Sequence, residues 1–212
     1  MRKIFLAALI MFTLCIPNFC GAVNISRVQN SNHDKIFYPQ VHMSNAAVEK
    51  KINVAILAEI DRFITGVYRN AQVNNYEVVD IRADYQIGSH EAGGTVILSV
   101  VFTKSNYYKG GAHPATTKHA MNFNVQTGEL MDISYLTDIG EGVDKADLIN
   151  MLEQKLRKQC ARENRYLFPE ALPLKKLPDE FYWDENLHVH FIFNHYEIAP
   201  YAAGIIDVDI DG

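Results

Sequence analysis

A stripe of apolar residues that recurs every four positions constrains the fold of this chain more than any other feature. The stripe consists of Val48, Ile52, Ile56, Ile60 and Ile64. Residues at this spacing share one face of an α-helix, because one turn takes about 3.6 residues. Ser44 and Asn45 precede the stripe and are residue types that cap helix N-termini. We therefore predict one long amphipathic helix over residues 45–68, with its apolar face covering a sheet.

Most of the remaining chain carries strand patterns. Residues 95–102 form a dense run rich in β-branched residues, which is typical of a central strand. Residues 35–41 resemble a short strand, and Pro39 favours an edge position for it. Further strands are predicted at residues 76–87, 117–125, 130–136, 187–194 and 205–210. Residues 126–129 contain Gly128, as a hairpin turn requires.

The order of these elements defines the fold class. A second helix is predicted over residues 143–162, where apolar residues again fall three or four positions apart. Residues 23–34 are polar and are expected to be loose. Because hairpin-like strands separate the helices, we predict an α+β fold, with a largely antiparallel sheet packed by two main helices. Its buried residues are expected to include Val96, Leu98, Val100, Phe102, Val189, Phe191 and Phe193.

Residues 1–22 have the composition of a secretory signal peptide. Arg2 and Lys3 are followed by an apolar run that stops near Ile16, and small residues come next. The run is shorter than the ~20 apolar residues that a transmembrane anchor needs. We therefore predict export, cleavage after Ala22, and a mature protein in the periplasm or outside the cell.

Removal of this leader changes the charge and the cysteine content. The net charge is −5 for the whole chain and becomes −7 without residues 1–22, which hold two basic residues and no acidic one. This charge favours a basic partner over nucleic acid, which needs clustered Lys and Arg. Cys160 is then the one remaining cysteine, so no internal disulfide is expected. Residues 23–105 and 106–212 are expected to form the two parts of one compact body.

Two segments carry residues suited to binding a ligand. The first segment contains Tyr107, Tyr108, Gly110, Gly111 and His113. Tyrosine rings provide rigid aromatic surface, and the adjacent glycines leave the backbone accessible, so the segment is suited to contact a partner. The alternative is a tight corner between two strands, in which the glycines serve the backbone conformation alone. No helix is predicted directly after the glycines, so a phosphate-binding loop is not favoured.

The second segment, residues 194–204, follows a predicted strand. It contains Tyr196, Glu197 and Tyr201. Two aromatic side chains beside an acid favour a binding surface. The alternative is a packed corner in which the tyrosine hydroxyls bond to the backbone. We predict that the residues named in the two segments bind a ligand, and we predict no catalytic residue, metal ligand or cofactor.

The histidines permit one enzymatic alternative, a zinc-dependent hydrolase acting on cell-wall glycans. His188 and His190 lie two apart on a predicted strand and so share a face. His113 would complete a set of three zinc ligands. His119 and His195 are further histidines that this alternative could bring near. Apolar residues alternate with the pair, however, so the pair is expected to face away from the core.

The two segments also carry a family resemblance. Residues 110–114, 122–128 and 193–204, in this order, resemble the extracytoplasmic domain of RsiV-type anti-sigma factors. The same domain occurs beside the catalytic module of PdaC-type peptidoglycan deacetylases. Residues 38–41 and 51–53 resemble the small domain that precedes it in that family. The resemblance covers nearly the whole mature chain.

The resemblance implies a non-catalytic α+β module outside the cytoplasm. In RsiV-type proteins the domain recognises lysozyme, and in the deacetylases it accompanies a cell-wall enzyme. This sequence shows no counterpart of the sigma-binding segment, the transmembrane helix or the deacetylase domain, so those activities are not carried over. The expected function is therefore a binding module whose ligand is a lysozyme-like protein or a cell-wall glycan.

Overall fold

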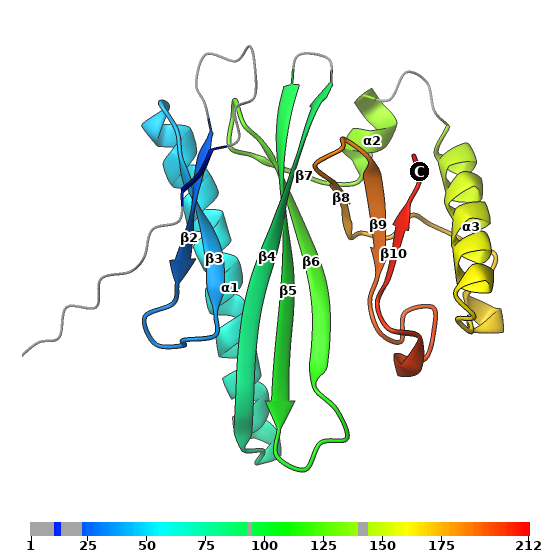
Figure 1. Ribbon diagram of the computed structural model, residues 1–212, viewed down its shortest axis with the longest axis horizontal. Helices are drawn as coiled ribbons and strands as arrows, with labels where there is room; N and C mark the ends of the chain where they lie inside the picture. Colours follow the sequence, from blue (N-terminus) through cyan, green and yellow to red (C-terminus); the bar gives the residue numbers. More distant parts are fainter. Residues whose placement is uncertain (1–10, 14–22, 93–94, 140–143) are drawn as a thin grey trace, which may run out of the picture. The chain divides into compact units, whose positions relative to one another are not determined.

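The computed structural model describes residues 11–13, 23–92, 95–139 and 144–212 (Figure 1). Its strands are β1 (Met11–Thr13), β2 (Asn24–Gln29), β3 (Phe37–His42), β4 (Val78–Ala92), β5 (Thr95–Tyr108), β6 (Ala115–Asn124), β7 (Leu130–Met131), β8 (Phe181–Trp183), β9 (Val189–Phe193) and β10 (Ile206–Asp209). Its helices are α1 (Ala46–Asn74), α2 (Ser134–Ile139), α3 (Lys145–Arg162) and the short 3-10 turns η1 (Pro169–Ala171) and η2 (Tyr201–Ala203). The described strands form three antiparallel sheets, ordered β1-β2-β3, β4-β5-β6-β7 and β10-β9-β8. The predicted α+β class is confirmed.

The chain forms two compact units, each built from segments that are distant in sequence. Unit 1 comprises Met1–Tyr85, Phe102–Ala115 and Thr127–Glu129. Unit 2 comprises Gln86–Val101, Thr116–Gln126 and Leu130–Gly212. Strands β4, β5 and β6 therefore contribute residues to both units. None of the helices in the described ranges is long and apolar enough to cross a membrane.

Helix α1 and strands β2 and β3 lie in unit 1, where α1 packs along β3 (Figure 1). The Asn45 side chain accepts hydrogen bonds from the backbone N–H groups of Ala47 and Val48, which confirms the predicted N-cap. The predicted stripe is buried at Val48, Ile52, Ile56 and Ile60. The helix is longer than the predicted 45–68, because buried residues continue the stripe to Ala71.

The prediction that residues 23–34 are loose was wrong, because Asn24–Gln29 form strand β2. This strand pairs antiparallel with β3, and Arg27 lies opposite Pro39. The Arg27 guanidinium binds both carboxylate oxygens of Asp84, at 2.6 and 3.0 Å. It also lies 4.0 Å from the centre of the Phe37 ring. These partners are distant in sequence, so the local polarity of the segment did not indicate them.

Unit 2 contains the β10-β9-β8 sheet with α3 packed on one face of it. The core between them includes Leu152 and Leu156 of α3 and Phe191 of β9, all fully buried. Cys160 is also buried there, and burial raises the pKa of its thiol. Burial of the predicted core residues is confirmed at Val96, Leu98, Val100, Phe102, Phe191 and Phe193, whereas Val189 is only partly buried.

Several predicted boundaries differ from the structure. The connection between the predicted strands 95–102 and 117–125 is shorter than expected, because β5 continues through Tyr108 and β6 begins at Ala115. Residues 130–136 pair as a strand only at Leu130–Met131 and then begin α2. Strand β8 was not predicted. It is only three residues long, which is too short to show a strand pattern. Its residues also give no sign that β9, the next strand, pairs with it.

Some predictions concern residues outside the described ranges. The leader, residues 1–22, lies outside them except for Met11–Thr13, which pairs with β2. The adjacent glycines Gly93 and Gly94 predict a turn from the sequence, and this turn also lies outside the described ranges. So does Val143, the first residue of the second predicted helix.

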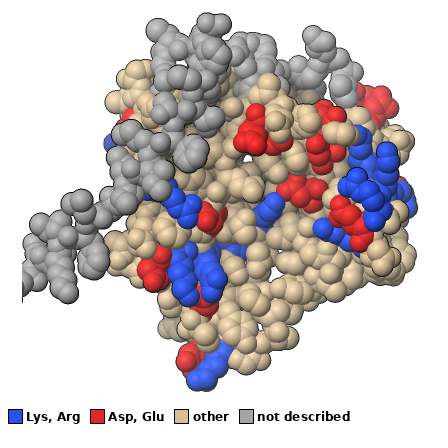
Figure 2. All heavy atoms as spheres, viewed as in Figure 1, with Lys and Arg blue, Asp and Glu red and all other residues tan. Residues whose placement is uncertain are grey.

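The face of the molecule drawn in Figure 2 carries charges of both signs. Lys and Arg side chains lie beside Asp and Glu side chains in several places on it. Among the described residues, ion pairs such as Arg157–Glu153, at 2.7 Å, bring opposite charges together. Interspersed charges are usual for a protein surface in water.

Candidate functional site

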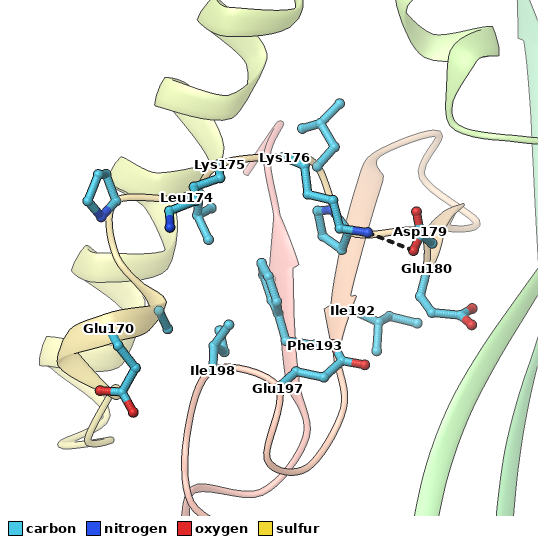
Figure 3. A pocket seen from close by; sticks show the side chains of 14 residues that line it. Glu170, Leu174, Lys175, Lys176, Asp179, Glu180, Ile192, Phe193, Glu197 and Ile198 are labelled. Atoms are coloured by element: carbon cyan, nitrogen blue, oxygen red, sulfur yellow. Dashed lines mark hydrogen bonds and ion pairs between the residues drawn. The ribbon is translucent and has the colours of Figure 1, made fainter.

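The candidate site for a ligand is a groove in unit 2 (Figure 3). One wall is the segment Glu170–Glu180, and the other is the end of β9 with the corner that follows it. The groove has a volume of about 490 Å³. It is lined by Glu170, Ala171, Pro173, Leu174, Lys175, Lys176, Leu177, Pro178, Asp179, Glu180, Ile192, Phe193, Glu197 and Ile198.

The wall Glu170–Glu180 is held by contacts near its middle and at its C-terminal end. The backbone N–H of Leu174 donates to the Glu153 carboxylate of α3 at 2.6 Å. Glu180 accepts from the backbone N–H of Ala120 at 2.7 Å, and its other oxygen lies 2.8 Å from His119 Nδ1. Two prolines further restrict the backbone of this segment. The wall is therefore positioned by α3 and β6 before any ligand arrives.

The floor of the groove is apolar. Ile192 and Phe193 at the end of β9 are buried, and so is Ile198 in the corner. The backbone N–H of Phe168 donates to the carbonyl of Ile198 at 2.9 Å, which joins the corner to the segment before η1. A floor of this kind accommodates an aliphatic or aromatic group of a ligand.

Acidic side chains outnumber basic ones around the groove. Its lining contains four carboxylates and two lysines, and Lys176 already pairs with Asp179 at 3.0 Å. Partial burial raises the pKa of the Glu197 carboxyl, and the negative charges of Glu180 and Asp179 raise it further. Hydrogen bonds with Asn194 offset part of this rise. The charged neighbours that act on Glu197 are themselves acidic, so its carboxylate would attract a cationic group of a ligand placed beside it.

The corner beside the groove is built around Asn194. Its side-chain oxygen accepts from the backbone N–H of Lys118 at 2.7 Å, and its side-chain nitrogen donates to the Lys118 carbonyl at 3.0 Å. Asn194 thus pairs with β6 as a neighbouring strand would. The corner displays Tyr196, which is 60% exposed, and Tyr201, whose ring stacks on His195 at 4.2 Å. Of the three residues predicted to bind in this segment, Glu197 lines the groove.

The first predicted segment is a corner in unit 1 that is held by hydrogen bonds. The Tyr107 hydroxyl donates to the Gly111 carbonyl at 2.8 Å, and Gly110 has a positive φ of 80°. The Tyr108 hydroxyl donates to the carbonyl of Val67 in α1 at 3.0 Å. The positive φ of Gly110 fits the alternative of a tight corner, and ligand binding by this segment stays a prediction.

The two predicted segments fall in different units. Tyr107, Tyr108, Gly110, Gly111 and His113 belong to unit 1, whereas Tyr196, Glu197 and Tyr201 belong to unit 2. The sequence analysis did not indicate the wall Glu170–Glu180 as part of a site. The alternation of apolar residues with Lys175, Lys176 and Asp179 is the one local signal that could have indicated a lining segment.

The zinc alternative gains no support from the arrangement of the histidines. His188 and His190 lie in unit 2, whereas His113 lies in unit 1, with Nδ1 3.1 Å from the Pro114 carbonyl. Across the described ranges, no three His, Cys, Asp or Glu side chains are placed to hold a metal ion. The histidine pair instead contacts two aspartates, at 2.9 Å in each case.

Comparison with known proteins places the groove within a family match. Residues 141–211 match the model of a family described as "Protein of unknown function (DUF3298)". A DUF3298 family protein from Bacteroides fragilis aligns with a TM-score of 0.46 and 15% identity, over 95% of this chain and 90% of its own. Another, from Pseudomonas aeruginosa, aligns with a TM-score of 0.49 and 14% identity, over 90% and 89%. No curated protein matches this chain.

Proposed function

We propose that this protein is a non-catalytic binding module that works outside the cytoplasm and recognises a basic, lysozyme-like protein. The groove beside Glu197 carries the proposal, because its apolar floor and acidic rim suit a lysine or arginine side chain. The aliphatic stem of such a side chain would cover the floor, and its charge would meet Glu197.

Two sequence features support a basic protein as the ligand. The chain without its predicted leader has a net charge of −7, which attracts basic proteins and speeds their encounter. The motif resemblance to RsiV-type and PdaC-type extracytoplasmic domains implies recognition of lysozyme. Export through the predicted signal peptide would bring the protein to the compartment in which lysozymes act.

A calorimetric titration of the purified protein with a lysozyme tests the proposal. Replacing Glu197 by Gln should weaken binding by roughly tenfold or more, because a hydrogen bond to a charged partner contributes about 1.5–3 kcal/mol. The matched control is Glu185→Gln, which removes an exposed carboxylate of unit 2 that does not line the groove. The control variant should bind as the unchanged protein does.

The salt dependence of binding and a titration with peptidoglycan fragments distinguish a protein ligand from a glycan ligand. Association with a basic protein should slow as salt rises, because salt screens exposed charges. Binding of neutral peptidoglycan fragments would depend on salt only weakly and would identify a glycan-binding module instead. If neither lysozyme nor peptidoglycan fragments bind, the proposed function is wrong. If lysozyme binds equally well to Glu197→Gln, the groove is not the site.

A further inference from the structure

Two histidine–aspartate pairs lie between strand β10 and the residues His188 and His190 at the start of β9. Side chains alternate between the two faces of a strand, so His190 of β9 points in the opposite direction to the core residues Phe191 and Phe193. His188 Nδ1 lies 2.9 Å from Asp209 Oδ2, and His190 Nδ1 lies 2.9 Å from Asp207 Oδ1. Both aspartates belong to β10. The two pairs therefore connect the last strand of the chain to the strand before it.

We propose that these pairs form a pH-sensitive latch, which holds β10 on β9 most tightly in mildly acidic solution and loosens as the pH rises. The position of β10 makes such a latch effective. It is an edge strand, and β9 is its one neighbour within the sheet. Each pair is diagonal: His190 lies directly opposite Asp209 in the register but binds Asp207.

The surroundings of His190 favour its charged form. Its ring stacks on Tyr182 of β8 at 4.7 Å. Its Nε2 is buried and makes no hydrogen bond, and it faces the carboxylate of Asp184 at 3.5 Å. In a neutral ring that carries its proton on Nδ1, an Nε2 lone pair would point at that carboxylate. A proton on Nε2 turns this repulsion into attraction, while Nδ1 still donates to Asp207.

Further charged groups surround the latch, because Lys155, Lys158 and Arg162 of α3 line one hollow together with Asp207 and Asp209. Asp207 also accepts from Lys118 of β6 at 2.8 Å and from the Tyr182 hydroxyl at 3.1 Å. Burial acts to raise the pKa of Asp207, but hydrogen bonds from His190 and Lys118 outweigh it, so this pKa is lowered. Burial likewise acts against ionisation of Asp209, and the hydrogen bond from His188 helps to lower its pKa.

The pKa values of both histidines are raised. For His188 the main cause is the hydrogen bond with Asp209, and the charges of Asp209, Asp184 and Asp211 add to it. For His190, burial acts to lower the pKa, but the hydrogen bond with Asp207 and the charges of the nearby aspartates outweigh it.

These directions define the pH range in which the latch holds. A raised histidine pKa stabilises the fold fully below the unfolded value of about 6.5, and this contribution is lost as pH rises through the folded pKa. A lowered aspartate pKa stabilises the fold above the unfolded value of about 4, and this contribution is lost as pH falls through the folded pKa. The latch is therefore strongest between about pH 4 and about pH 6.5.

Urea unfolding of the purified protein at about pH 5.5 and about pH 8.5 tests the latch. The unfolding constant should rise between the two values, by tenfold for each unit by which a histidine pKa is raised. In the variant His188→Gln/His190→Gln the rise should be smaller, because Gln does not titrate. The control His33→Gln removes a histidine of unit 1 that is distant in sequence from the latch, and it should leave the rise unchanged.

An NMR titration of the two imidazole rings gives a readout that does not depend on how well the double variant folds. Titration midpoints of His188 and His190 above about 6.5 would support the latch. Midpoints at or below that value would overturn it. A double variant that folds and keeps the full pH dependence of the unfolding constant would also overturn it.

Discussion

The close approach of β4 to β8 in unit 2 leads to a sharp prediction at Gly88. A Cβ on Gly88 would lie 1.7 Å from the carbonyl oxygen of Trp183 and 3.0 Å from Cα of Asp184. Atoms that are not bonded need about 3.5 Å, so one backbone would have to move by ~1.8 Å to admit alanine. Trp183 cannot move freely, because its N–H donates to the buried Ser99 hydroxyl at 3.1 Å.

The expected cost of Gly88→Ala is about 3 kcal/mol, at the upper end of the range for overpacked cores, because the obstacle is backbone. Gly66→Ala is the matched control. Gly66 lies in α1, and nothing stands within 4 Å of its ideal Cβ. Alanine in a helix interior is favoured over glycine by about 0.5–1 kcal/mol, so this variant should be more stable.

Urea denaturation followed by circular dichroism measures both changes. The two glycine-to-alanine variants should shift the unfolding midpoint in opposite directions. If Gly88→Ala unfolds within about 0.5 kcal/mol of the unchanged protein, the close approach of β4 to β8 is not rigid and the reasoning fails.

Two further predictions concern cleavage of the leader and the structural role of Tyr108. The exported protein should begin at Val23, and an intact-mass measurement that finds Met1 retained would contradict cleavage of the leader. Tyr108→Phe should cost about 1 kcal/mol of stability, because it removes the bond to the Val67 carbonyl. The same variant should bind lysozyme unchanged, and weaker binding would return the segment Tyr107–His113 to consideration as the binding surface.

The candidate site was predictable only in part. The acid and aromatic residues of the corner were identifiable, because Tyr196, Glu197 and Tyr201 stand together in a segment without a strand or helix pattern. The sequence did not indicate that Glu197 faces the wall Glu170–Glu180. Nor did it indicate that Asn194 substitutes for a strand beside β6, since a lone asparagine has no pattern that names its partner.

The amino-acid sequence alone determined the elements whose evidence is local. The four-residue stripe specified α1 and its buried face, Asn45 specified where it starts, and alternation specified that Phe191 and Phe193 share one buried face of β9. The tertiary structure decided which segments pair. Strands β2 and β8, the groove and the histidine–aspartate pairs all depend on contacts between residues distant in sequence. The periodicity of a sequence indicates the direction in which each side chain points. Which residue that side chain contacts depends on how the whole unit packs.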